Sequence, residues 1–307
     1  MPLFLRRKEV IAGSCVLAIL IGVAAFVALY KKAPEIAPAA AVKSGPTYKV
    51  IGTSMEGRKI ESYTYLPAEA SAQTGGKGQQ HLAFVGGMHG GYEWNSVLLA
   101  YTFMDYLESN PEAIPKNLTV TVIPSLNPDG VFKVTGKEGR FEIADVSTDK
   151  TILESGRFNA NGVDLNRNFD CKWKPEATWR SKTVSAGGEA FSEPEARVLR
   201  SFISETHPDA VIFWHSQANA VYASECEEGI LPATLDIMNA YANASGYRPA
   251  ISFDAYEVAG DSEGWLASIG IPAITVELKT HETIEWERNL AGIKALFEYY
   301  DRTASSF

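Results

Sequence analysis

The sequence predicts a single-domain α/β fold, preceded by one membrane-spanning helix at the N-terminus. Short apolar runs typical of buried strands alternate with segments of helical periodicity, which is the pattern of a sheet covered by helices. The 307 residues, 46% of them hydrophobic, suffice for one sizeable core, and no internal repeat divides the chain. Near the N-terminus, residues 10–30 contain no charged side chain.

The N-terminal apolar stretch is long enough to cross a bilayer and has basic residues on both sides. A cleaved signal peptide is the alternative, because the small residues at 37–41 suit signal peptidase. Those residues follow two lysines and lie far from the apolar run, which favours an uncleaved anchor. The chain would comprise a cytoplasmic tail (1–8), a transmembrane anchor (9–30), a linker (31–46) and an extracytoplasmic domain (47–307).

The charge of the chain is unevenly distributed. The first 32 residues hold five Lys or Arg and one acid, so the remainder carries 23 basic and 36 acidic residues, a formal charge of −13. This acidity argues against nucleic acid or an anionic membrane surface as a partner. The domain holds two cysteines, Cys171 and Cys226, which permit one disulfide in an exported protein, while two free buried thiols remain the alternative.

Strand and helix patterns alternate through the first half of the domain. A β-branched run follows the first helical segment, so the strands on either side of that helix are expected to be parallel. The predicted elements are an edge hairpin over 48–53 and 59–66, a buried strand over 81–88, a helix over 94–110, a strand over 118–124 and a turn over 127–130.

The second half continues the alternation but contains longer polar segments. The loop over 157–169 is too rich in Asn, Arg and Asp to lie in a core. The other predicted elements are an irregular segment over 136–155, a capping box at 192–195 that opens a helix, a strand over 210–214, a helix over 232–244, a loop over 256–265, a strand over 273–276 and an amphipathic C-terminal helix.

Three of the predicted strands end in residues that suit a metal site. His89 and Glu93 follow the first, His215 follows the second and Glu277 follows the third. Because the carboxyl ends of parallel strands meet at one edge of a sheet, these side chains are expected to converge. Two histidines and one glutamate would hold one zinc ion with an open position, which leaves Glu277 as the base that activates water.

The same segments resemble the zinc metallocarboxypeptidases of the carboxypeptidase A type, over about residues 48–300. The matching motifs are His89 to Trp94 for zinc binding, Asn127-Pro-Asp-Gly130, Gly162-Val-Asp-Leu-Asn-Arg-Asn-Phe169, His215-Ser-Gln217 and Thr275-Val-Glu-Leu278. The resemblance implies a mixed, mostly parallel sheet of eight strands with helices on both faces. It also places Cys171 and Cys226 near the rim of the active site.

One motif departs from the pattern of that family. The family has two residues between the first histidine and the glutamate, whereas Gly90, Gly91 and Tyr92 make three here. We expect Glu93 to remain a ligand, with the two glycines absorbing the extra residue in the turn.

The resemblance also implies roles for five further residues. Asn166 and Arg167 would hold the terminal carboxylate of the substrate, and Arg157 would stabilise the oxyanion. Tyr256 corresponds to a mobile tyrosine that closes over the bound substrate. Glu263 falls at the base of the side-chain pocket, where a carboxylate is typical of members that remove basic residues. The alternatives are an ordinary loop aromatic for Tyr256 and solvated loop acids for Glu263 and Asp261.

The expected function is that of a membrane-anchored zinc carboxypeptidase with one zinc ion per chain and a preference for basic C-terminal residues. The first alternative is a peptidase of the same fold that cuts peptidoglycan stem peptides near diaminopimelate, so the substrate is a peptide or a muropeptide. An amidohydrolase of N-acyl amino acids is disfavoured by the loop around Tyr256, and a zinc-free binding protein by the presence of Glu277. The sequence indicates no protein partner.

Overall fold

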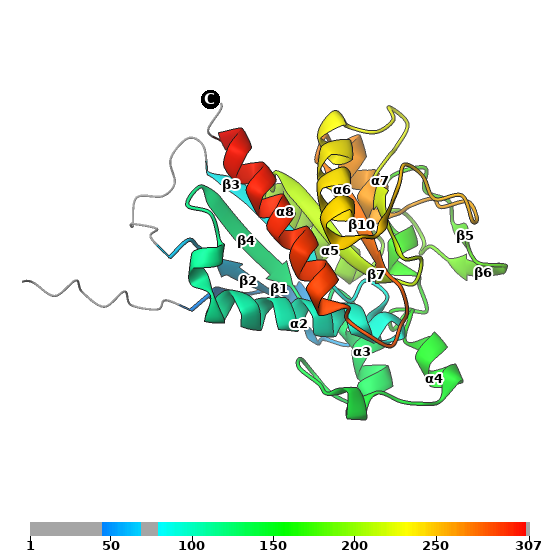
Figure 1. Cartoon of the computed structure of the whole chain (residues 1–307). Coiled ribbons are helices and arrows are strands. Elements are labelled where there is room, and N and C mark those ends of the chain that lie inside the picture. The colour runs from blue at the N-terminus through cyan, green and yellow to red at the C-terminus, as the bar shows by residue number, and fades with distance from the viewer. Residues whose placement is uncertain (1–44, 69–78, 305–307) are drawn as a thin grey trace, which may run out of the picture. The chain divides into compact units, whose positions relative to one another are not determined.

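The computed structural model describes residues 45–68 and 79–304 and shows a mixed eight-stranded sheet with helices on both faces (Figure 1). The sheet order is β1-β2-β4-β3-β7-β10-β8-β9. The predicted α/β class and the eight-stranded mixed sheet are therefore confirmed. The strands are β1 (Thr47–Thr53), β2 (Lys59–Tyr65), β3 (Gln80–Val85), β4 (Leu118–Ile123), β7 (Ala210–Ser216), β8 (Ala220–Ala223), β9 (Arg248–Ala250) and β10 (Ala273–Leu278), with a separate hairpin of β5 (Glu176–Trp179) and β6 (Lys182–Ser185).

The centre of the sheet is parallel and its flanks are mostly antiparallel. Strands β4, β3, β7 and β10 run parallel to their neighbours in this block, whereas β1, β2 and β8 pair antiparallel. All seven residues of β7 are buried, as expected of a parallel strand covered on both faces. The parallel block gives β3, β7 and β10 a common carboxyl edge.

Two apolar cores lie on the two faces of the sheet. Residues Phe84 and Trp214 face the first core, where they pack with α2 (Trp94–Ser109), α6 (Pro232–Ser245) and α8 (Trp286–Ala304). Val85 and Phe213, one position away on the same strands, face the second core with α5 (Pro194–Thr206) and α7 (Ser262–Ser268). This alternation is the period of two expected of strands.

The remaining helical elements are short and lie in connections. They are α3 (Pro128–Thr135), α4 (Lys150–Ser155) and the 3-10 turns η1 (Gly90–Glu93), η2 (Pro111–Ala113), η3 (Ile143–Asp145) and η4 (Leu165–Arg167).

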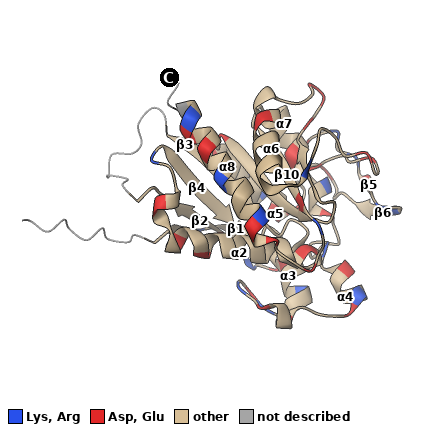
Figure 2. Cartoon of the chain, viewed as in Figure 1, with Lys and Arg blue, Asp and Glu red and all other residues tan. Residues whose placement is uncertain are grey.

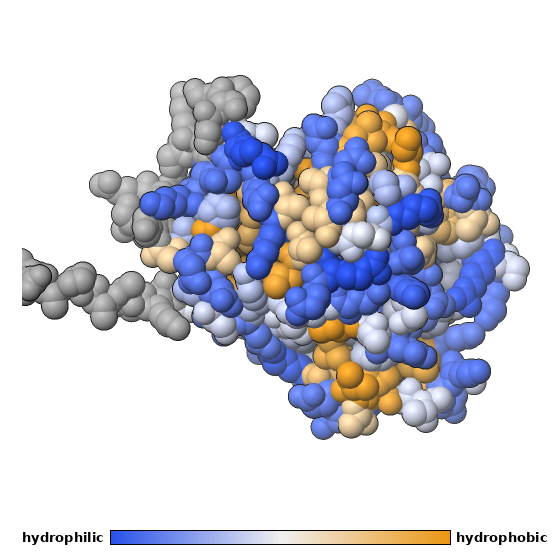
Figure 3. Space-filling view, viewed as in Figure 1, coloured by the Kyte–Doolittle hydropathy of each residue, from blue (hydrophilic) through white to orange (hydrophobic). Residues whose placement is uncertain are grey.

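The face of the molecule shown in Figure 3 is mostly hydrophilic. Acidic and basic residues are interspersed along α8 (Figure 2). Apolar surface appears over α3 and α4, the part of the chain where Phe132, Ile143 and Ile152 are exposed (Figure 3).

Four local predictions were wrong. The segment 136–155 is not irregular throughout, because it contains η3 and α4. Asn127 to Gly130 is not an isolated turn but the start of α3, because the Asn127 side chain accepts a hydrogen bond from the Gly130 N–H and caps the helix. Helix α5 has Glu193 at its N-cap without a side-chain cap, so the capping box is absent. The segment 256–265 is not all loop, since Asp261 caps α7 by accepting from the Gly264 N–H.

Within the described residues, no helix combines the length and the apolar character needed to span a membrane. The segment 9–30, for which the sequence predicts a membrane anchor, lies outside the described residues, as does most of the linker.

Candidate functional site

The metal-site residues predicted from three strand ends do lie together. In the parallel pair of β7 and β10, Glu277 is directly opposite His215, and β3 is the next strand on the other side of β7. The chain leaves β3 through Gly86 and Gly87 and reaches His89 at the carboxyl edge. The convergence inferred from the parallel order is therefore confirmed.

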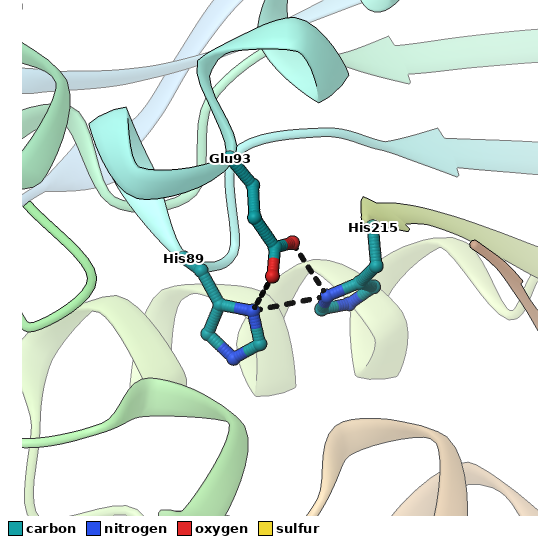
Figure 4. Close-up of side chains that lie close together, drawn as sticks. All are labelled: His89, Glu93 and His215. Carbon is teal, nitrogen blue, oxygen red and sulfur yellow. Dashed lines mark hydrogen bonds and ion pairs between the residues drawn. The ribbon is translucent and has the colours of Figure 1, made fainter. Parts of the chain in front are cut away.

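The turn between His89 and Glu93 depends on its two glycines. Gly90 has a φ of +48°, which non-glycine residues rarely adopt, and the segment from Gly90 to Glu93 forms η1. A Cβ atom on Gly91 would lie 2.4 Å from Cβ of Val134. The close approach of α3 thus requires glycine here, and the turn accommodates the additional residue while Glu93 still points toward His89 (Figure 4).

The three predicted ligands bring their donor atoms to one point (Figure 4). Nδ1 of His89 is 2.8 Å from Oε1 of Glu93, and Nδ1 of His215 is 3.0 Å from Oε2 of the same carboxylate. The two Nδ1 atoms lie 3.1 Å apart. Ligand atoms in a tetrahedral zinc site are separated by roughly 3.3 Å, given bonds of about 2.0–2.1 Å. In the described part of the chain, these residues are the one group of three or more His, Cys, Asp or Glu able to hold a metal ion, and all three are buried.

The electrostatics of the cluster suit a cation. Burial alone would raise the pKa of Glu93, but the neighbouring charges of His89 and His215 hold this pKa well below its usual value. For His215, burial lowers the pKa, but the charges of Glu93 and Glu263 outweigh burial and raise it to about 10. Protonated His215 therefore already balances the charge of the Glu93 carboxylate, and a bound metal ion would replace that proton.

A buried aspartate backs the first histidine. Oδ1 of Asp164 lies 3.3 Å from Nε2 of His89, on the side of the ring opposite Glu93. Arg157 in turn donates from Nε to Asp164 at 2.9 Å, and its Nη1 lies 3.7 Å from Glu93. Asp164 was not among the predicted site residues, although it lies in the same polar loop as Asn166 and Arg167.

Glu277 is the carboxylate of this site without a histidine partner. Its Oε2 is buried and has no hydrogen-bond partner among the described residues. Burial and the charge of Glu93 raise the pKa of Glu277 to about 8. The positive charge of a bound metal ion would lower this pKa and favour the carboxylate.

Asn166, Arg167 and Tyr256 lie together, as the resemblance implied. Oδ1 of Asn166 accepts hydrogen bonds from the backbone N–H and the hydroxyl of Ser262, which fixes its amide. Arg167 donates three hydrogen bonds, two to the Thr178 carbonyl and one to that of Asn166. A guanidinium has five N–H donors, so two remain for a ligand. The ring of Tyr256 lies 6.0 Å from the Arg167 guanidinium carbon.

Two acids, the partly buried Asp261 and the buried Glu263, lie beside this group. Burial and the charge of Glu263 raise the pKa of Asp261 to about 6. Burial opposes ionisation of Glu263 as well, but His215 lowers the pKa of Glu263 to about 2. A disulfide joins Cys171, shortly after Arg167, to Cys226, so the pairing permitted by the cysteine count is present.

All nine predicted site residues line one cavity of about 730 Å³. Three aromatic residues that also line this cavity were not predicted: the ring of Tyr92 lies 5.2 Å from that of Trp179 and 4.7 Å from that of His281. Trp179 belongs to the small hairpin of β5 and β6, for which no prediction was made. Single aromatic residues scattered over the sequence carry no signal that could have grouped them.

Comparisons with known proteins agree with this geometry. The family model described as zinc carboxypeptidase (peptidase M14) matches residues 39–291. A gamma-D-glutamyl-L-diamino acid endopeptidase 1 from Lysinibacillus sphaericus is 26% identical over 66% of this chain and 55% of its own length. A carboxypeptidase B from Helicoverpa zea is 31% identical over 51% of this chain and 40% of its own length. The chain thus spans about half the length of these curated relatives.

Solved structures show the same fold. The crystal structure of a murein-tripeptide amidase from Escherichia coli O157 has a TM-score of 0.59 and 23% identity, over 85% of this chain and 96% of that one. Because the family model covers most of the chain and the metal-binding triad is in place, the chain belongs to the zinc carboxypeptidase family of metallopeptidases, with His89, Glu93 and His215 as its zinc ligands.

Proposed function

We propose that this protein is a carboxypeptidase that removes C-terminal residues bearing a basic side chain. The observation that carries the proposal is the buried acid Glu263, which together with the partly buried Asp261 lines the same cavity as Arg167. A carboxylate in a desolvated pocket favours a cationic side chain and penalises an apolar one, because an apolar group would leave the acid buried without a partner.

The residues of the cavity divide the chemistry between them. Zinc, when bound, acts as a Lewis acid toward the scissile carbonyl. Glu277 takes the proton from the attacking water and delivers it to the leaving amine, as general base and then general acid. Arg157, held by Asp164, presents its guanidinium to the developing oxyanion. Asn166 and the two remaining N–H groups of Arg167 hold the terminal carboxylate, over which Tyr256 closes.

A second candidate is a peptidase of cell-wall stem peptides. The relative from Lysinibacillus sphaericus is named for a diamino acid bond, and a diamino acid also carries an amine that suits Asp261 and Glu263. Lys172 and Arg180 line the same cavity, and either could take an additional carboxylate of such a substrate.

A panel of peptides that differ only in the last residue tests both candidates. We expect faster cleavage before Lys or Arg than before Leu or Phe, and loss of activity with a chelator. Faster turnover of a γ-D-glutamyl-diaminopimelate peptide than of any Lys or Arg peptide would favour the second candidate. Equal rates for basic and apolar residues would contradict the role of the acidic pair.

We also propose that the domain faces the outside of the membrane, anchored by residues 9–30. The uncharged segment flanked by basic residues supports an anchor. The disulfide between Cys171 and Cys226 supports an oxidising compartment. Protease added to intact cells should digest the domain while leaving a cytoplasmic marker intact, and recovery of the full chain in the soluble fraction would contradict the anchor.

A further inference from the structure

The two zinc-binding histidines each have a second ring nitrogen that faces away from the metal site. For His215 this atom is Nε2, which is buried and makes no hydrogen bond of normal geometry with the described residues. The acidic atom facing it is Oε1 of Glu263, at 3.5 Å. The side chains of both residues are at least 96% buried, so water does not screen this contact.

The Glu263 carboxylate is held in this position from two sides. Its Oε1 accepts a hydrogen bond of 2.9 Å from the hydroxyl of Thr275, and its Oε2 lies 3.0 Å from the hydroxyl of Ser262, whose one proton it shares with Oδ1 of Asn166. Thr275 and Glu277 lie two residues apart on β10 and therefore share one face of the sheet. The strand that presents Glu277 thus also fixes the carboxylate behind His215.

We propose that Glu263 is a positioning residue of the zinc site, which orients His215 through Nε2. A carboxylate at Nε2 favours the tautomer with its proton on that nitrogen. The lone pair of Nδ1 then faces Glu93 and the metal. Asp164 has the corresponding place behind His89, at 3.3 Å from its Nε2. Both histidine ligands are therefore backed by a buried carboxylate that comes from a different segment of the chain.

This role is separate from recognition of a basic substrate. It rests on the zinc site alone, whereas the proposed preference for basic residues rests on the acidity of the pocket. Asp261 distinguishes the two roles, because it lines the same cavity but accepts its hydrogen bond from the Gly264 N–H at 2.7 Å. Asp261 is thus a matched pocket acid that caps α7 instead of holding a zinc ligand.

The test measures the zinc dissociation constant of the full chain by competition with a chelator. We expect Glu263→Ala to bind zinc about 10- to 100-fold more weakly, the usual effect of losing a group that supports a metal ligand. Glu263→Gln keeps an oxygen that can accept from Nε2, so it should recover part of this loss. Asp261→Asn, which keeps the cap of α7, should stay within about threefold of the wild type.

The visible absorption spectrum of a cobalt-substituted sample reports the geometry of the metal ligands, and a general loss of stability would leave it unchanged. Glu263→Ala should change the visible absorption bands of bound Co²⁺, and Asp261→Asn should leave them unchanged. A Glu263→Ala dissociation constant within threefold of the wild type, or equal weakening by Asp261→Asn, would overturn the proposal. If Glu263→Ala does not fold, Glu263→Gln decides: unchanged zinc affinity and unchanged cobalt bands overturn the proposal.

The second measurement compares the rates at which each variant cleaves C-terminal Lys and Leu from peptides at saturating zinc. Loss of Lys preference in both Glu263→Ala and Asp261→Asn, with weaker zinc only in the former, supports both roles. Weaker zinc in Glu263→Ala with no change in preference for either variant would contradict the basic pocket and leave the positioning role intact.

Discussion

Three buried carboxylates and the partly buried Glu277 surround the two zinc-binding histidines, and their environments give them different pKa values. Although burial opposes ionisation of each, neighbouring charges hold the pKa values of Glu93 and Asp164 well below normal and lower that of Glu263 to about 2. Burial and the charge of Glu93 instead raise the pKa of Glu277 to about 8. Carboxylates whose environments push their pKa values apart take different roles, and Glu277 is the one suited to proton transfer.

Replacing Glu277 by Gln should abolish most turnover without removing zinc. The amide has nearly the same shape but cannot take a proton, so we expect kcat to fall by 10²- to 10⁴-fold, the usual share of general acid–base catalysis. Turnover and zinc content measured on the same preparation check this. A variant that retained zinc and a rate near that of the wild type would require another base.

Zinc binding should release a proton below about pH 10. In the metal-free protein the pKa of His215 is raised from 6.5 to about 10, since the effect of burial is outweighed by Glu93 and Glu263. Zinc binds the unprotonated ring, so the zinc dissociation constant should fall as the pH rises toward 10. In the metal-free protein, the charged His215 ring contributes to the free energy of unfolding. This contribution has its full value below pH 6.5, and it decreases as the pH rises from 6.5 to about 10.

Calorimetric titration with zinc at pH 8, in buffers of different ionisation enthalpy, counts the released protons. Wild-type protein should release at least one proton per bound zinc ion, because His215 is protonated at this pH before zinc binds. Zinc binding without proton release would show that His215 is not the charged ligand in the metal-free state.

At the scale of elements, the site depends on turns whose backbones approach each other closely. The turn η1 places Glu93, and it packs against α3 and α4 through glycines that leave no room for a side chain. From Gly90 and Gly91, the sequence predicted only that the turn accommodates an additional residue. It did not predict which residues pack against the turn. The packing partners, Val134 and Gly156, are distant in sequence and had no recognisable signal.

Gly91→Ala should therefore weaken zinc binding, although Gly91 is not a zinc ligand. The new Cβ would lie 2.4 Å from Cβ of Val134, so η1 must shift and Glu93 with it. Overpacking of this kind costs about 1–3 kcal/mol of unfolding free energy. Gly188→Ala, whose Cβ would meet nothing within 4 Å and whose φ is not in the left-handed region, is the control. Zinc affinity and melting temperature should fall in the first variant and not in the second.

The disulfide should stabilise the polar loop beside the cavity. Cys171 and Cys226 are 55 residues apart, and closing a loop of that length restricts the unfolded chain by an amount worth about 4 kcal/mol. The double replacement by Ser should lower the unfolding free energy by about 2–4 kcal/mol in denaturant titrations. An unchanged denaturation midpoint would mean that the cysteines are reduced in the protein as isolated.

On the scale of the whole molecule, the zinc ligands unite segments that are distant in the chain. His89 and His215 are 126 residues apart, so the unfolded chain cannot hold the site. Zinc should thus stabilise only the folded state, by about 4 kcal/mol when free zinc is 1,000-fold above its dissociation constant. A chelator should lower the melting temperature of the wild type and leave His215→Ala unchanged, and equal shifts in both would contradict this linkage.

Much of this arrangement could be predicted from the sequence, because it follows from the order of strands. The apolar runs that end at His89, His215 and Glu277 are local signals, and parallel packing then brings their ends together. The resemblance supplied Asn166, Arg167 and Tyr256. Neither the strand pattern nor the resemblance revealed the hairpin of β5 and β6 that supplies Trp179. Neither revealed the contact between Glu263 and His215, because it depends on how α7 packs against β10.

Because Glu277 pairs with His215 across β7 and β10, metal binding also shows whether these two strands have paired in the correct register. Neighbouring residues of a strand point to opposite faces, so a slip of one position between these strands would send one of the two side chains away from the cavity. In a refolding mixture, molecules with such a slipped strand would retain a compact core but would not assemble the site. Titration with a colorimetric metal indicator would then count the molecules whose central strands have paired correctly, independently of any substrate.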